Sequence, residues 1–184
     1  MASNNVNLGV GAATGMFFHA TSGTALPAYP TESLGAAWKE VGYIAEDGIT
    51  WHHGRSAEPL KDWSNSIRRQ LQNDATGTVS APIISTTNEV LSTLFGASNV
   101  TTAAATTAHG VLDSVEVEEG VMSGEEAFLF LMKDGDDTMM LGTTKGFITS
   151  LDDVSFAPGS VITWGATVSA DSWTFMKDNG QAST

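Results

Sequence analysis

The pattern of apolar and polar positions along the chain predicts a protein built mainly of strands. Short apolar runs at residues 15–20 and 127–132 are bounded by turn-forming residues, and residues 162–168 alternate between apolar and small or polar side chains. Both faces of the 127–132 run are apolar, so we expect a central strand that is covered on both sides. The alternating segment is expected to bury one face only.

Two turn signals separate runs that are rich in β-forming side chains. Residues 46–48 and residues 133–136 each contain an Asp-Gly pair between two such runs. Asp-Gly supplies the backbone conformations that tight turns and two-residue hairpins require. Both places are therefore predicted to be hairpins or tight turns.

One segment has the periodicity of a helix, which is predicted over residues 87–95. Thr86 and Glu89 have the spacing of a capping box, in which a hydroxyl and a carboxylate satisfy the first free amides of a helix. Gly96 stands where such a helix would end. The apolar stripe at helical spacing consists of Val90, Leu91, Leu94 and Phe95. A helix this short must be stabilised by packing that stripe on a sheet.

The other segments are arms and loops of one 184-residue domain. Residues 1–24 form an uncharged amino-terminal arm, whose apolar run at 16–18 suits a contact better than a free surface. Residues 49–75 are long, polar and mixed in charge, and are interpreted as a long loop or hairpin. Residues 98–108 are interpreted as an insertion or a strand edge, and residues 178–184 as a flexible carboxyl terminus.

The chain is strongly acidic, and its acidity is concentrated after residue 69. It has 8 Lys and Arg against 21 Asp and Glu, a formal net charge of −13 and a pI near 4.4. Residues 1–38 carry −1, residues 39–69 are neutral, and residues 70–184 carry −12. This balance argues against a protein that grips DNA, because such affinity comes mostly from Lys and Arg that neutralise phosphates. A solvated acidic surface that keeps the protein soluble is the alternative interpretation.

No motif points to an enzyme, a cofactor site or a metal site. The absence of cysteine excludes disulfides, thiolate metal sites and thiol nucleophiles. A calcium loop that starts at Asp134 requires Glu at its twelfth position, where the chain has Lys145. The histidines lack metal-ligand spacing, and no nucleotide-binding or Gly-x-Ser-x-Gly motif is present. Adjacent acids point to opposite faces of a strand, so glycosidase chemistry would require an acid pair from distant segments.

Targeting signals are missing as well. The first residues lack the basic and apolar regions of a signal peptide, and no apolar run approaches the roughly 18 residues of a membrane span. We therefore expect a protein that folds in a cytoplasm and has no membrane partner.

The most specific pattern in the sequence lies at residues 38–50, which read Trp-Lys-Glu-Val-Gly-Tyr-Ile-Ala-Glu-Asp-Gly-Ile-Thr. The Gly-Tyr-Ile and Glu-Asp-Gly elements resemble a segment of the major tail tube proteins of bacteriophages with long, non-contractile tails. Similar elements follow in that family's order at residues 60–63, 67–68 and 88–96. The resemblance covers residues 25–100 well and the remainder in outline.

This resemblance implies a mainly β protein, a β-sandwich or barrel with one flanking α-helix, that assembles as hexameric rings stacked into a tube. Each subunit is expected to give about four strands to a continuous inner barrel, through which double-stranded DNA passes without specific binding. The implied partners are the tape measure protein, the tail terminator and the distal tail proteins. The implied location is the virion tail, assembled in the host cytoplasm.

Two groups of residues are expected to act in such a tube. The near-neutral segment 49–75 is the candidate for contact between rings, unless its tryptophans lie in the subunit core. Its candidate anchors are Trp51, Trp63, Arg68 and Arg69. The acids within residues 113–137 are the candidates for lining the bore, because negative charge prevents DNA from adhering. They include Glu116, Glu118, Glu125, Glu126 and Asp136.

Three other functions stay open from the sequence. A tube-forming subunit of a secretion apparatus would share the fold and move protein instead of DNA. A carbohydrate-binding β-sandwich would expose its tryptophans as a platform for sugars, and an acidic hydrolase would need a distant acid pair.

Overall fold

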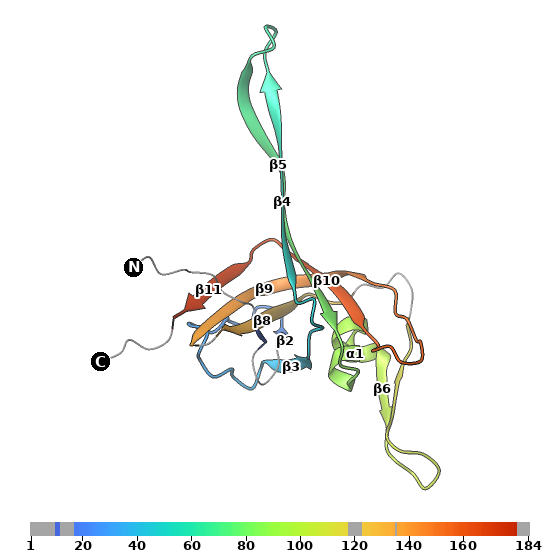
Figure 1. The fold of residues 1–184 in the computed structure, drawn as a ribbon. Coiled ribbons are helices and arrows are strands. Elements are labelled where there is room, and N and C mark those ends of the chain that lie inside the picture. The colour runs from blue at the N-terminus through green and yellow to red at the C-terminus, as the bar shows by residue number, and fades with distance from the viewer. Residues whose placement is uncertain (1–9, 12–16, 118–122, 135, 180–184) are drawn as a thin grey trace, which may run out of the picture.

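The computed structural model describes residues 10–11, 17–117, 123–134 and 136–179. Within these residues it confirms a mainly β fold with one α-helix (Figure 1). The strands are β1 (Val10–Gly11), β2 (Phe17–Thr21), β3 (Lys39–Gly42), β4 (Thr50–Lys61), β5 (Ile67–Ile83), β6 (Val100–Ala103), β7 (Leu112–Val115), β8 (Glu126–Asp134), β9 (Asp137–Leu151), β10 (Trp164–Ala170) and β11 (Thr174–Asp178). The helix α1 spans Asn88–Phe95, and a 3₁₀ turn, η1, follows at Ala97–Asn99.

The main sheet is antiparallel and bends around the core. Its strand order is β3-β2-β8-β9-β10-β5-β4. The long strand β9 is shared between two parts, since residues 138–142 pair with β11 and residues 147–151 pair with β10. Ile44, just after β3, forms a bridge with Ile83 at the end of β5. This bridge joins distant strands of the sheet and closes it in the manner of a barrel.

The largest apolar cluster fills the interior of this barrel. It includes Phe17, Val79, Ile83, Phe128, Phe130, Ile148 and Val168. The rings of Phe17 and Phe130 stack with their centroids 4.6 Å apart. Helix α1 adds Val90 and Leu94 to the same cluster, so its apolar stripe packs on the sheet as the sequence predicts.

A second apolar cluster lies on the other face of β8. Leu129 packs there with Phe18 and Met140, beneath side chains from the segment between β2 and β3 that include Leu26 and Trp38. Strand β8 is therefore covered on both sides, which confirms the interpretation of residues 127–132. In β10, Ala166 and Val168 are buried while Thr167 and Ser169 are half-buried, which confirms the one-sided pattern.

The helix begins differently from the predicted capping box. The N-cap is Thr87, whose hydroxyl accepts a hydrogen bond from the amide of Val90 over 3.3 Å. The hydroxyl of Thr86 instead accepts a bond from Trp164 Nε1 at 2.9 Å, and the carboxylate of Glu89 turns toward His19. The capping box is therefore wrong, because both of its side chains are engaged by other strands. Gly96 ends the helix with φ of 88°, as predicted.

The two turn signals have different outcomes. Residues 134 and 137 pair directly, so the second signal marks a hairpin between β8 and β9. At the first signal the amide of Gly48 donates to the carbonyl of Ala45, and Gly48 has φ of 71°. This is a tight turn and not a hairpin, since β3 and β4 lie in separate parts of the sheet.

The amino-terminal arm contributes directly to the core. Phe17 and Phe18 are buried within the subunit. This part of the apolar run is therefore a core strand and is not available for contact with another subunit. Residues 1–9 and 12–16 of the arm, and residues 180–184 of the carboxyl terminus, lie outside the described residues.

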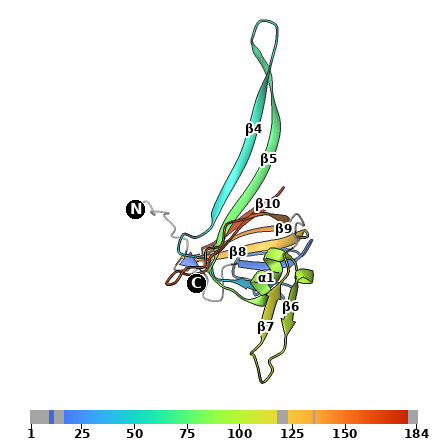
Figure 2. The same ribbon diagram turned by 90° about the vertical axis from the view of Figure 1, so that its right-hand side faces the viewer.

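Two β-ribbons extend from the body in opposite directions. The hairpin of β4 and β5 rises from one end, and the ribbon of β6 and β7 descends from the other, in both views (Figures 1 and 2). Residues 98–108, interpreted from sequence as an insertion or strand edge, form part of this second ribbon, which pairs Val100 with Val115.

Candidate functional site

The β4–β5 hairpin is the most prominent surface feature of the protein. Its strands pair from Thr50 with Ser80 to Lys61 with Ile67, and β5 is also held by β10 over residues 77–83. Beyond Gly77 the two strands pair only with one another. The eight residue steps from Gly54 to Asp62 correspond to a projection of about 27 Å.

The tip of the hairpin is ordered by one carboxylate. Asp62 Oδ1 accepts bonds from the amide and hydroxyl of Ser64, at 2.9 and 2.6 Å, and from the amide of Ser66 at 3.0 Å. Asp62 Oδ2 accepts from Arg68 Nε at 2.6 Å and forms an ion pair with the same guanidinium. The hydrogen bonds from Ser64, Ser66 and Arg68 lower the pKa of Asp62, so the carboxylate that orders the turn stays ionised into acid conditions.

The four residues expected to contact another ring fall in two places. Trp63 is fully exposed at the tip, where Arg68 and Arg69 are also exposed. Trp51 lies at the base of the hairpin, half-buried against the barrel core, with its ring centroid 4.0 Å from that of His53. The sequence left open that both tryptophans lie in the subunit core. Trp51 packs against the core, whereas Trp63 does not.

The expected bore-lining acids are not gathered in one patch. Glu116 is exposed just after β7, and Glu125 is exposed before β8, where it accepts a bond from Ser22 Oγ at 2.7 Å. Asp136 is exposed at the far end of β8, about 27 Å along the strand. Glu126 is half-buried and bound to His19, and Glu118 lies outside the described residues.

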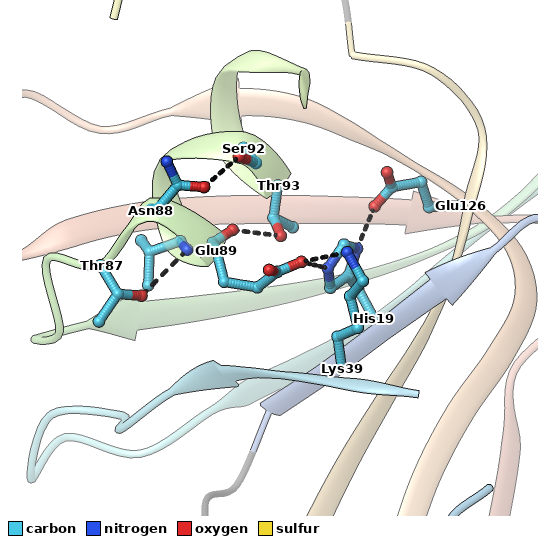
Figure 3. Close-up of polar contacts among 9 residues, drawn as sticks. His19, Lys39, Thr87, Asn88, Glu89, Ser92, Thr93 and Glu126 are labelled. Carbon is cyan, nitrogen blue, oxygen red and sulfur yellow. Dashed lines mark hydrogen bonds and ion pairs between the residues drawn. The ribbon is translucent and has the colours of Figure 1, made fainter. Parts of the chain in front are cut away.

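A polar cluster that the sequence did not predict joins four elements near the helix. His19 of β2 lies with Nε2 2.7 Å from a carboxylate oxygen of Glu89 on α1 and with Nδ1 2.9 Å from one of Glu126 on β8 (Figure 3). Lys39 of β3 donates to Glu89 at 3.1 Å. No sequence pattern indicates this cluster, because the partners of His19 lie 70 and 107 residues away along the chain. Only the strand register, which pairs His19 with Phe128 beside Glu126, brings them together.

The cluster stabilises the charged forms of its members. Burial lowers the pKa of His19, but the hydrogen bonds to Glu126 and Glu89 outweigh burial and raise the pKa above its ordinary value. Burial likewise opposes ionisation of Glu89, but its bonds to His19 and Lys39 outweigh burial and lower its pKa. The arrangement suits an imidazolium between two carboxylates, since both ring nitrogens face acceptors.

The outer face of the four strands β9, β10, β5 and β4 carries two rows of residues in which serine and threonine predominate. One row across the sheet pairs Phe147, Ser169, Thr78 and His52, and the next pairs Ser150, Thr167, Ser80 and Thr50. The opposite face carries the buried core residues of the same strands. This hydroxyl face has no Lys, Arg, Asp or Glu in either row.

The described residues contain no group of three or more His, Asp or Glu side chains placed to hold a metal ion. No helix within the described ranges is long and apolar enough to cross a membrane.

Comparison with known proteins places this chain in a family. The sequence model of a family described as phage tail tube protein matches residues 1–176. The fold is similar to a tube-terminating cap of the anti-feeding prophage, with 12% identity, a TM-score of 0.47, and coverage of 97% of this chain and 100% of that one. It is also similar to a chain of the sheath–tube complex of an extracellular contractile injection system, with 11% identity, a TM-score of 0.41 and coverage of 90% of both chains. No curated protein matches the sequence.

Proposed function

Because the chain belongs to the phage tail tube protein family, we propose that it polymerises as stacked hexameric rings into the tail tube of a phage with a long, non-contractile tail. In this proposal the tube conducts double-stranded DNA from the capsid to the host cell. The observation that carries it is the β4–β5 hairpin, which projects from a closed barrel and ends in a fully exposed tryptophan. Such a surface fits a contact between copies and has no evident use in a monomer.

The hairpin is proposed to join one ring to the next. Trp63 and Arg69 are residue types that dominate the binding energy of protein interfaces, and both are exposed at the tip. Arg68 keeps the tip ordered through Asp62, which lowers the entropy lost on contact. Trp51 contributes indirectly, because it packs the base of the hairpin on the core.

The hydroxyl face is proposed to form the wall of the bore. Its four strands match the number expected from each subunit, and β4 has one edge that pairs with no other described strand. Pairing at the free edges of neighbouring subunits would give a continuous barrel without exposed edges. The serine and threonine hydroxyls of this face keep the wall hydrated, and its two rows carry no Lys or Arg to attract a phosphate.

The width of such a barrel suits a DNA duplex. With six subunits, 24 strands spaced by about 4.8 Å and tilted by about 40° give a backbone diameter of roughly 48 Å. Side chains of about 5 Å on each wall leave a bore near 38 Å, which admits a duplex about 20 Å across with its water.

The acidic charge is proposed to keep DNA from adhering to the tube. Of the five candidate acids, the exposed Glu125 and Asp136 suit this role best, because His19 compensates the charge of Glu126 and Glu116 lies on the ribbon of β6 and β7. The net charge of −13 on every subunit also makes the potential in a narrow, low-dielectric bore negative, including beside the two rows that carry no acid. Replacing Glu125 and Asp136 with lysine should slow DNA ejection while tubes still form, and normal ejection would contradict this role.

The family is one of structural proteins, and we propose that this member has no catalytic activity. Its proposed partners are further copies of itself, the tape measure protein, the tail terminator and the distal tail proteins. Assembly is proposed to occur in the host cytoplasm and to end in the virion tail.

A pair of matched variants tests the proposed function. Trp63→Ala should leave a folded subunit that sediments as single subunits or rings, because the tip contact is lost. Tyr29→Ala removes another exposed aromatic side chain, away from the hairpin, and should leave tubes intact. Sedimentation and negative-stain microscopy give the readout. Unimpaired tubes from Trp63→Ala would contradict a stacking role for the hairpin.

A further inference from the structure

The two β-ribbons give the subunit two unlike ends. We call residues 58–69 the hairpin tip and residues 98–117 the ribbon end. The hairpin tip and the ribbon end point in opposite directions in both views, and in Figure 1 the ribbon end is displaced sideways from the hairpin (Figures 1 and 2). Copies stacked head to tail in this direction bring the tips of one ring toward the ribbon ends of the next. Unlike surfaces that meet in this way form an open, repeating contact, as a filament requires.

The hairpin tip offers a cation and apolar side chains. Arg69 is exposed, and its guanidinium has no carboxylate partner within the described part of the chain. Leu60, Trp63 and Ile67 are all more than half exposed beside it. The tip therefore combines an unpaired positive charge with an aromatic anchor.

The ribbon end offers the opposite charge and its own apolar side chains. The chain has no Lys or Arg between Gln70 and Met132, so the ribbon carries neither. Glu116 is exposed, and its carboxylate has no hydrogen bond or ion pair to any described residue. Val111, Leu112 and Val117 are each at least half exposed.

The ribbon end also contains a groove, whose shape is fixed by hydrogen bonds within the ribbon and to helix α1. The groove has a volume of about 620 Å³ and is lined by Ser98, Asn99, Thr101, Ser114, Val115, Glu116 and Val117. The amide of Glu116 donates to the carbonyl of Asn99 at 3.0 Å, and Thr102 donates to Asp113 at 2.6 Å. Asn88 at the start of α1 bonds Thr102 at 2.6 Å, which fixes the ribbon to the helix.

We propose that the ribbon end receives the hairpin tip of a second copy of this chain in the next ring, with Trp63 in the groove and Arg69 facing Glu116. This inference rests on the proposed stacking of rings and identifies the receiving surface. We infer that the occupant is a second copy because the two surfaces are complementary. The positive charge of the tip matches the negative charge of the ribbon end, and both surfaces expose apolar side chains. The preformed groove and the ordered tip both reduce the entropy lost on contact.

Site-directed cross-linking tests the contact in the assembled protein. The natural chain has no cysteine, so two introduced cysteines are the sole targets of a short bis-maleimide linker. A variant with Leu60→Cys and Ser98→Cys should give a ladder of cross-linked subunits in tubes. The control variant with Leu60→Cys and Ser33→Cys, whose second cysteine lies between β2 and β3, should stay monomeric. Tubes that cross-link only in the control would overturn the assignment.

A charge exchange provides an independent test. Arg69→Glu and Glu116→Arg should each raise the concentration needed for tube formation at least about tenfold, because like charges then face one another. The double variant should recover most of the loss, and Glu46→Arg on the 46–48 turn should have no effect. Additive losses in the double variant would overturn the pairing. If the unaltered chain forms no tubes at all, the proposed function itself fails; if tubes form without the ladder or the recovery, only this inference fails.

Discussion

His19 Nε2 lies 2.7 Å from Glu89 Oε1 and thereby ties strand β2 to the first turn of helix α1. The second ring nitrogen of His19 is equally committed to Glu126 on β8. A neutral imidazole has one N–H and leaves one of these carboxylates facing a lone pair. Protonation of His19 therefore adds to the apolar packing of Val90 and Leu94 that holds the helix on the barrel.

The stability of the isolated subunit should depend on the charge of His19. Its pKa is raised by folding, so its contribution is complete below the ordinary value of 6.5 and declines as the pH rises through the folded value. The pKa of Glu89 is lowered, so its contribution is complete above the ordinary value of 4.5 and declines as the pH falls through the folded value. The cluster is strongest between these two pH values.

Urea unfolding at pH 5.5 and pH 8.5 measures this effect. His19→Gln should lower the free energy of unfolding by about 1–3 kcal/mol at pH 5.5 and by less at pH 8.5. His109→Gln changes an exposed histidine and serves as the control. An equal loss at both pH values for His19→Gln would contradict the role of the imidazolium.

The stacking of Phe17 on Phe130 predicts a large effect on folding. Phe17→Ala removes a fully buried ring from the barrel core and should lower the free energy of unfolding by about 3–5 kcal/mol. Chemical denaturation of the subunit at low concentration gives the value. A variant that is as stable as the unaltered subunit but fails to assemble would instead place this run in a contact between subunits.

The base of the hairpin depends on a glycine that packs on an indole. A Cβ at Gly77 would lie 2.6 Å from Trp173 Cδ1, whose ring also donates from Nε1 to the carbonyl of Gly77 at 2.9 Å. Gly77→Ala should therefore cost about 1–3 kcal/mol of unfolding free energy, measured by thermal or urea unfolding. Gly35→Ala, where a Cβ meets no atom within 4 Å, is the matched control. Equal stability of the two variants would contradict the close contact.

The carboxylate of Asp62 predicts an effect on assembly without an effect on folding. Asp62→Asn weakens the bonds that order the tip, which makes contact by Trp63 entropically more costly. Tube formation, followed by light scattering, should therefore require a higher protein concentration, while the unfolding curve stays nearly unchanged. Asp47→Asn, on the turn before β4, should assemble normally. Normal assembly of Asp62→Asn would show that order at the tip is not required.

Local patterns predicted those parts of the fold that local physics determines. The doubly apolar run at 127–132 became a central strand because a segment with two apolar faces needs cover on both sides. The helix was located by the apolar stripe of α1, which needs cover from the sheet, and by Gly96, which ends it. The His19 cluster joins residues that are 70 and 107 positions apart, and the separation of β3 from β4 depends on which strands pair in the sheet. No local pattern encodes either.

The candidate site was predicted in part for a similar reason. The mixed composition of residues 49–75 indicated a surface excursion, and the structure shows a projecting hairpin there. Composition gave no means to distinguish Trp51 from Trp63, because their difference lies in distance from the core along the hairpin. The acids looked like one group in sequence, yet strand length separates Glu125 from Asp136 in space.

Cryo-electron microscopy of the purified, assembled protein shows directly whether the chain forms a tube. We expect tubes of stacked sixfold rings, with a bore near 38 Å, a wall formed by the hydroxyl face and the hairpin tip of each subunit on the next ring. Monodisperse particles of single subunits under conditions that keep the protein folded, or rings that stack without the hairpin, would contradict it.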